Sequence, residues 1–384
     1  MTFLYENSII PISYHEFIND IRNTSHLQKY FSSNFNDIKT TNYCGFINVG
    51  GINYFIIPKI SNDDTSNLNT FLYMLIYAEN INLSNDDIAN LSNNEFKIID
   101  VFIRYFSNTL LEQLKKGLFG KYQTAEANLK VLKGKYIIRK NFENFFHQNI
   151  FSEIDEFTSN NELGNFFLFA IKTFMKYSTY INLKRCEQIL YEVEFEHFDV
   201  YRMSIKFDRT NQRFQKSYEL AILILKKLMP NFNDSNNTSF AFLFNMAEIF
   251  EKFIGKMYKN IDSSTRLQYQ KNFGNLQLKP DIETSDMIID TKYKIVKDRN
   301  DLATNDKYQM FTYGVNFGIK NTMLLYPKHF QKDFKDEDLK LGVEDNEVIL
   351  KIRSIDLMSN GAGYHGYIEK IKNDLKALAN EFIK

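Results

Sequence analysis

Two aspartates and a lysine lie close together in the chain and could act as one chemical group. Asp281 follows Pro280, while Asp290 and Lys292 lie in the next apolar stretch, and residues 283–286 between them are polar. This pattern predicts two short strands joined by a turn. Because side chains alternate along a strand, Asp290 and Lys292 share one face. Asp281 is expected near the open end of the same hairpin, so the three side chains converge.

The chemistry expected of this trio is metal-assisted hydrolysis. Two carboxylates offer the hard oxygen ligands that Mg²⁺ prefers, and the bound ion keeps several waters. Such a water loses a proton more easily, and a nearby lysine can stabilise charge on a phosphate that is being cleaved. The pattern resembles the core motif of the PD-(D/E)xK nucleases. Short matches of this kind are common, so an ordinary charged surface hairpin is the alternative interpretation.

A third carboxylate is expected to join the trio from a helix. The spacing of apolar residues predicts one helix over residues 240–259, and Glu251 lies in line with Phe244 and Ile254 on its apolar face. A carboxylate that faces a core is costly unless it is paired or bound to a metal. Glu251 is therefore a candidate metal ligand. The alternative is a glutamate at the border of the helix that extends its carboxylate into solvent.

Two further polar residues belong to a helix that follows the hairpin. A helix is predicted from Thr304 to about Phe317, and it places Gln309 and Tyr313 one turn apart on one face. Their Gln-x-x-x-Tyr spacing resembles that of RecB-type nucleases. We expect both side chains to support the site or to contact the DNA backbone.

The order of the elements around these residues indicates the fold. Helix, strand, strand, helix and strand follow one another, which fits an α/β nuclease core with a mixed sheet. Earlier in the chain, residues 43–60 are typical of two strands joined at Gly50 and Gly51. We therefore expect an α+β protein. A mixed β and helical region, residues 1–230, precedes a PD-(D/E)xK endonuclease domain, residues 231–384.

Composition narrows the class of protein. The chain has 384 residues and a net charge of +0, so its overall charge does not by itself indicate a nucleic-acid binder. No apolar run reaches the length of about 18 residues that a membrane helix needs. No secretory signal is evident, and Cys44 and Cys186 are far apart in sequence, so a cytoplasmic location is expected. Residues 104–140 are rich in lysine and arginine, which could meet phosphate, an acidic partner or only solvent.

Several segments resemble, in order, those of the McrC family, the endonuclease subunit of McrBC modification-dependent restriction systems. These segments are residues 43–59, 127–135, 157–163, 250–254, 279–294 and 306–313. Six matches in one order are more specific than any one of them. The chain departs from the family's pattern at Ala247 and Glu248, where the family often has Asn and Arg.

The resemblance implies a division of labour between two proteins. The partner would be an McrB-like AAA+ GTPase ring, which binds the GTP, since this chain lacks a P-loop motif. The N-terminal region would dock to the ring and stimulate it, and the C-terminal domain would hydrolyse double-stranded DNA that contains modified cytosine. In that domain, Mg²⁺ would be held by Asp281, Asp290 and Glu251, the attacking hydroxide would be positioned by Lys292, and support would come from Gln309 and Tyr313.

Two other functions stay open at this point. One is a non-catalytic adaptor that activates an AAA+ partner, although the intact Asp281, Asp290 and Lys292 set speaks against it. The other is a stand-alone RecB-like nuclease, which would not need the large N-terminal region.

Overall fold

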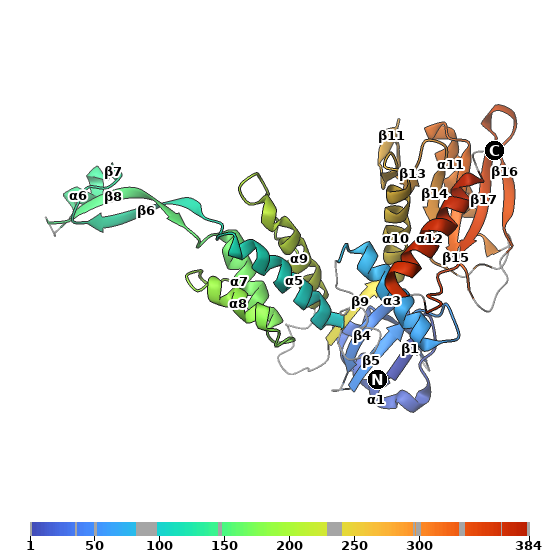
Figure 1. Ribbon diagram of the computed structural model, residues 1–384, viewed down its shortest axis with the longest axis horizontal. Coiled ribbons are helices and arrows are strands. Elements are labelled where there is room, and N and C mark those ends of the chain that lie inside the picture. The colour runs from blue at the N-terminus through green and yellow to red at the C-terminus, as the bar shows by residue number, and fades with distance from the viewer. Residues whose placement is uncertain are drawn as a thin grey trace. The chain divides into compact units, whose positions relative to one another are not determined.

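The computed structural model (Figure 1) describes residues 2–34, 37–49, 52–81, 98–144, 148–228, 240–294, 296, 301–329, 335–361 and 363–381. The chain divides into two compact units. Unit one combines residues 1–96 with residues 230–384, and unit two comprises residues 97–229. Each unit has buried apolar side chains of its own.

The first sheet of unit one has four strands in the order β1-β5-β4-β9. β1 and β5 run parallel, whereas β4 is antiparallel to both β5 and β9. The strands are β1 (Thr2–Tyr5), β4 (Tyr43–Val49), β5 (Ile52–Ile57) and β9 (Phe240–Asn245). The remaining elements of this part are η1 (Ile12–Tyr14), α1 (His15–Asn23), α2 (Ser25–Gln28), the β2 (Phe31–Ser33) and β3 (Ile38–Thr40) pair, and α3 (Asp64–Ala78). The predicted strands around residues 43–60 are present, and the Gly50–Gly51 turn lies outside the described residues.

The prediction of one helix over residues 240–259 was wrong at its start. Residues 240–245 form β9, and helix α10 (Met246–Ile261) begins only after Asn245, whose side chain accepts a hydrogen bond from the amide of Ala247 at 2.9 Å. The alternating aromatic residues of this stretch suit a strand, and pairing with β4 satisfies their backbone groups. Glu251 stays within the helical part.

The second sheet of unit one has six strands in the order β10-β13-β14-β15-β17-β16. β14, β15 and β17 are parallel, and the other pairs are antiparallel, so the sheet is mixed as predicted. Its strands are β10 (Arg266–Leu267), β13 (Ile282–Glu283), β14 (Ile288–Thr291), β15 (Asn321–Pro327), β16 (Glu337–Leu341) and β17 (Val348–Ile355). A separate two-stranded ladder pairs β11 (Lys271–Phe273) with β12 (Leu276–Leu278).

Helices pack against this second sheet and fix its central strands. α11 (Thr304–Phe317) contacts β14, β15 and β17, while α10 contacts β14 and α12 (Gly363–Asn380). A short turn, η5 (Glu344–Asn346), precedes β17. The core between α11 and the sheet includes Ile288, Met310, Leu324 and Leu350, all fully buried. The apolar residues of β14 thus anchor the strand that carries Asp290.

Unit two joins a helical bundle to a long antiparallel ribbon. The helices are α5 (Ile98–Lys115), α7 (Glu162–Phe174), α8 (Ile181–Ile189), η2 (Gln212–Phe214) and α9 (Gln215–Leu228). Buried phenylalanines, among them Phe106, Phe166 and Phe174, fill the interior of the bundle. The ribbon consists of β6 (Lys121–Leu129) paired with β8 (Ile150–Thr158), and it carries β7 (Lys135–Tyr136) and α6 (Ile138–Phe142). Figure 1 shows the ribbon extending away from the helices of its own unit.

The boundaries of the two compact units differ from those of the predicted regions, residues 1–230 and 231–384. Residues 1–96 belong with the C-terminal part of the chain because β9, which follows residue 230, completes the sheet that β4 begins. Residues 97–229 form an insertion between them. Among the described helices, none has the length and hydrophobicity that a bilayer crossing requires.

Candidate active site

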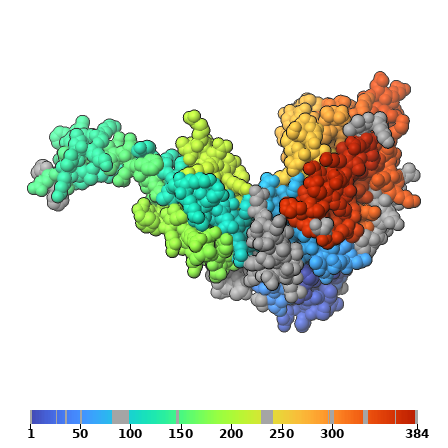
Figure 2. All heavy atoms as spheres, viewed as in Figure 1, coloured from blue at the N-terminus to red at the C-terminus, as the bar shows by residue number. Residues whose placement is uncertain are grey.

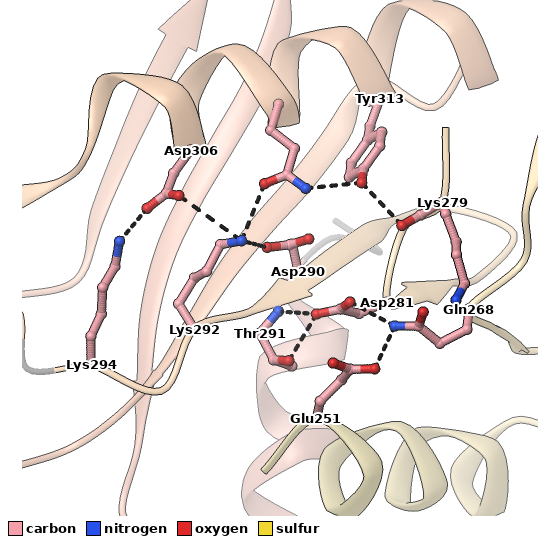
Figure 3. Close-up of polar contacts among 11 residues, drawn as sticks. Glu251, Gln268, Lys279, Asp281, Asp290, Thr291, Lys292, Lys294, Asp306 and Tyr313 are labelled. Atoms are coloured by element: carbon pink, nitrogen blue, oxygen red, sulfur yellow. Dashed lines mark hydrogen bonds and ion pairs between the residues drawn. The ribbon is translucent and has the colours of Figure 1, made fainter. Parts of the chain in front are cut away.

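Asp281 is held in place by three hydrogen bonds (Figure 3). Its Oδ2 accepts from the backbone amide and from the hydroxyl of Thr291, both at 2.8 Å, and its Oδ1 accepts from Nε2 of Gln268 at 2.8 Å. The residue directly precedes β13, while β12, upstream of it, pairs with β11 in a separate ladder. The pairing of β13 with β14 brings Asp281 beside Thr291 and hence beside Asp290.

Asp290 and Lys292 form the centre of a continuous polar chain. Asp290 lies in β14 with 2% of its surface exposed, and its Oδ2 is 2.5 Å from Nζ of Lys292. Lys292 also donates to Oε1 of Gln309 at 3.1 Å, and Nε2 of Gln309 donates to the hydroxyl of Tyr313 at 2.9 Å. The Tyr313 hydroxyl donates in turn to the carbonyl oxygen of Lys279 at 3.0 Å. Strand β14 and helix α11 therefore bring these four predicted residues together.

Glu251 reaches the site through an intermediary that the sequence did not suggest. From helix α10 its Oε1 accepts a hydrogen bond from Nε2 of Gln268, the same nitrogen that donates to Asp281. The backbone amide of Gln268 also donates to the carbonyl oxygen of Asp281 at 2.9 Å, and its φ of 50° lies in the left-handed region. Gln268 follows β10 and is remote in sequence from both carboxylates, so no local pattern indicates it.

A second residue that the sequence analysis missed is Asp306, at the start of α11. Its Oδ2 pairs with Nζ of Lys294 at 2.5 Å, and its Oδ1 lies 3.9 Å from Nζ of Lys292. Asp306 precedes Gln309 by three positions and Tyr313 by seven, so helical spacing places all three on one face. That spacing was a signal from which Asp306 could have been predicted.

Acidic side chains lie close together in this site and are largely shielded from solvent, which changes the pKa values of its groups. Burial and the neighbouring Asp281 raise the pKa of Asp290 to about 6, although Lys292 opposes the shift. Burial, together with Asp281 and Asp290, raises the pKa of Glu251 to about 7. Burial acts to lower the pKa of Lys292, but Asp290 and Asp306 outweigh it and the pKa is raised. Lys292 therefore remains a cation beside carboxylates that repel one another.

A comparison with protein-family models shows to which family this chain belongs. A family model described as a McrBC 5-methylcytosine restriction system component matches residues 38–327, which is most of the chain. The chain belongs to the McrBC family. No curated protein matches it.

A solved structure shares the fold of this McrBC-family chain. A tetradecameric assembly of Thermococcus gammatolerans McrB AAA+ hexamers with bound McrC contains a chain that matches with a TM-score of 0.66 at 19% identity, covering 98% of this chain and 99% of that chain. A cryo-EM structure of the Thermococcus gammatolerans McrBC complex matches with a TM-score of 0.47 at 20% identity, covering 67% of this chain and 86% of that chain. The fold shared with the first of these structures covers nearly the whole of this chain.

The carboxylate oxygens of this McrBC-family chain's candidate site are ligands of the type that Mg²⁺ prefers. Burial, together with repulsion from neighbouring carboxylates, raises the pKa values of Glu251 and Asp290, and a divalent cation would relieve that repulsion. Within the described residues, no three Asp, Glu, His or Cys side chains are grouped closely enough to hold an ion by themselves. Mg²⁺ usually binds one or two carboxylates and keeps several waters. Asp281 and Asp290 therefore fit as the ligand pair, with Glu251 linked to Asp281 through Gln268.

Proposed function

We propose that this chain is the DNA endonuclease subunit of an McrBC-type restriction system and hydrolyses phosphodiester bonds of double-stranded DNA with Mg²⁺. The observation that supports this most directly is the convergence of Asp281, Asp290 and Lys292, with Lys292 2.5 Å from Asp290. A half-buried lysine cation next to a pair of carboxylates is the arrangement that phosphoryl hydrolysis needs, because charge of both signs must be stabilised at one place. Modified-cytosine DNA is the proposed substrate, on the basis of the family.

The residues would divide the work as follows. Asp281 and Asp290 would hold Mg²⁺, which when bound supplies a more acidic water and neutralises charge on the phosphate. Lys292 orients the attacking water and stabilises the negative charge that develops on the phosphoryl oxygens. Water adds to phosphorus and one P–O bond breaks, which leaves a phosphate at one end and a hydroxyl at the other. The contacts of Gln309 with Lys292 and Tyr313 keep the ammonium directed at Asp290.

An McrB-like AAA+ GTPase is the proposed partner. The solved assembly with the similar chain contains McrB AAA+ hexamers with bound McrC, and the shared fold covers nearly all of this chain. A partner that also holds the DNA would be consistent with the net charge of +0. We propose that GTP is bound by the partner and not by this chain.

The β6–β8 ribbon is the part of the N-terminal region that we propose for docking to this partner. It exposes large apolar side chains, with Phe142 87%, Val131 72% and Tyr122 70% accessible. Figure 2 shows the ribbon as a narrow projection of its unit. Exposed apolar side chains along one element can mark an interaction surface. Docking would cover these side chains, and the lysines around them would meet an acidic surface.

Plasmid cleavage with Mg²⁺ tests the proposal. Wild type, Lys292→Ala and the exposed control Lys340→Ala are each assayed with and without the co-encoded GTPase and GTP, on methylated and unmethylated plasmid. Cutting by wild type and the control, only with partner and GTP, is the expected result. Cutting by wild type alone would favour an independent nuclease. Faster GTP hydrolysis with no cutting of either plasmid would favour a non-catalytic adaptor.

A further inference from the structure

A cavity of about 540 Å³ lies in unit one, next to the candidate active site but with a different set of residues. Lys294, which lines it, pairs with Asp306, and Asp306 is 3.9 Å from Nζ of the catalytic Lys292. The volume is that of a small-ligand site. None of the roles assigned above uses this cavity.

Four strand ends from two different sheets form its wall. Glu6 follows β1 and Lys59 lies two positions after β5, and these strands are a parallel pair in the four-stranded sheet. Lys294 lies beyond β14 and Lys328 directly follows β15, which are a parallel pair in the six-stranded sheet. All four residues line the cavity. The carboxyl ends of parallel strands are where open α/β sheets most often bind ligands.

A part-buried hydrogen bond between two residues that line the cavity joins the segments that follow the two sheets. The hydroxyl of Tyr293 donates to Oε1 of Glu6 at 2.6 Å, and the same oxygen accepts from the amide of Lys59 at 3.2 Å. Burial raises the pKa of Glu6 to about 7, so its negative charge is weakened near neutral pH. These two hydrogen bonds hold the Glu6 side chain in place at the edge of the cavity.

The charge of the wall is positive. Lys59, Lys294 and Lys328 line it together with His329, and among the described residues of the lining Glu6 is the only acid. Within the described residues, Lys294 is paired with Asp306, whereas no ion pair is formed by Lys59 or Lys328. Asn7, Ser8 and Asn42 add polar groups around the same space. Lysines that form no ion pair, together with hydrogen-bonding groups, are suited to phosphate.

We propose that this cavity binds a phosphate group, and that in the working enzyme this is a backbone phosphate of the DNA strand beside the one that is cleaved. This assignment rests on the proposed nuclease function, because the link from Lys294 through Asp306 to Lys292 places the cavity along the path of a strand whose scissile phosphate lies at Lys292. A free nucleotide carries the same phosphate chemistry and is the second possible source of the ligand.

The test compares lysine variants of the full-length chain, alone and with its partner GTPase. Lys59→Gln/Lys328→Gln removes the two unpaired cations, and Lys59→Glu/Lys328→Glu reverses them. Lys340→Gln/Lys376→Gln, outside the cavity, removes the same charge as a control. Binding of a short fluorescent duplex is measured in Ca²⁺ over a range of salt concentrations, and binding of inorganic phosphate and dCMP is measured separately. Thermal unfolding verifies that every variant is folded.

For the Lys59→Gln/Lys328→Gln protein we expect the slope of log affinity against log salt to fall by about 1 for each lysine that meets a phosphate. The charge-reversed protein should bind still more weakly, and the control should match wild type. Loss of dCMP and phosphate binding with unchanged duplex binding would support the cavity as a phosphate site and assign it to a free nucleotide. Variants that match the control with all ligands would overturn the inference.

Cleavage assays separate this inference from the proposed function. If wild type cuts DNA and both cavity variants bind and cut as the control does, the cavity inference fails alone. If no protein cuts DNA but duplex binding depends on Lys59 and Lys328, the nuclease proposal fails and the phosphate site stands.

Discussion

The candidate active site and the β6–β8 ribbon differ in almost every physical respect. In the site, Asp290 is nearly inaccessible, and each charged group is fixed by a named partner, as when Gln268 bridges Glu251 and Asp281. On the ribbon, Phe142 and Val131 are mostly exposed, and charged residues pair at the surface, as Lys135 does with Glu153. Chemistry needs charges held in advance in a dry place, whereas association needs apolar surface that can be covered.

This difference indicates that cutting and partner activation can be separated by mutation. Changes at the site remove charges that the surrounding protein holds rigidly, so their effects should fall on cleavage. Changes on the ribbon remove side chains that the proposed docking would cover, so their effects should fall on association.

Asp281→Asn should reduce DNA cleavage by at least about 100-fold, because it removes a proposed metal ligand, and losses of this size follow removal of one charge-stabilising group. GTPase stimulation should be unchanged. Initial rates of plasmid nicking and of GTP hydrolysis in the same mixtures measure both. Glu248→Gln, on the same helix as Glu251 but outside the polar network, is the control. Equal cleavage by Asp281→Asn and the control would contradict the assignment.

Glu6→Gln should change how the stability of unit one depends on pH. Burial raises the pKa of Glu6 from 4.5 to about 7, opposed in part by hydrogen bonds from Tyr293 and Lys59. The folded state therefore favours the protonated acid, and wild type should lose up to about 3 kcal/mol of unfolding free energy as pH rises through this range. The variant lacks this loss, so its stability relative to wild type should increase with pH.

Urea unfolding at several pH values tests this, with the exposed Glu16→Gln as control. Parallel stability curves for wild type and Glu6→Gln would show that burial of Glu6 has no such effect. Ribbon substitutions should leave the pH dependence unchanged, which sharpens the contrast between the two regions.

Val131→Ser/Phe142→Ser should weaken the complex with the partner GTPase by about 10- to 100-fold, the range expected when buried apolar anchors of an interface are lost. The unfolding temperature should not change, because both side chains are already exposed. Sedimentation with the partner gives the affinity. Ile181→Ser/Tyr191→Ser alters exposed apolar residues elsewhere in the same unit, and an equal loss with this control would argue against a docking role for the ribbon.

Gln268→Ala should raise the Mg²⁺ concentration for half-maximal cleavage by about tenfold, as is typical when a residue that orients metal ligands is removed. Asp281 and Glu251 each lose a hydrogen bond and repel one another more freely. The Mg²⁺ titration of cleavage measures the effect, and Gln277→Ala, exposed in β12, is the control. An unchanged titration would mean that Gln268 does not position the carboxylates.

The sequence predicts best those features whose residues are close together in the chain. The alternation that places Asp290 and Lys292 together, and the helical turn between Gln309 and Tyr313, are short-range patterns, and the structure contains them. The apolar run at residues 240–245 could be strand or helix by pattern alone, and its pairing with β4 decided the matter. Gln268 joins the site only through tertiary pairing, which no spacing in the sequence encodes.

The most direct test of the account is one preparation of Asp290→Ala measured in two ways, for cleavage of modified plasmid and for assembly with the GTPase and stimulation of GTP hydrolysis. We predict that cleavage is abolished while assembly and stimulation equal those of wild type. Cleavage at the wild-type rate, or loss of assembly by a folded variant, would contradict the claim that this site cuts DNA and that a separate surface binds the partner.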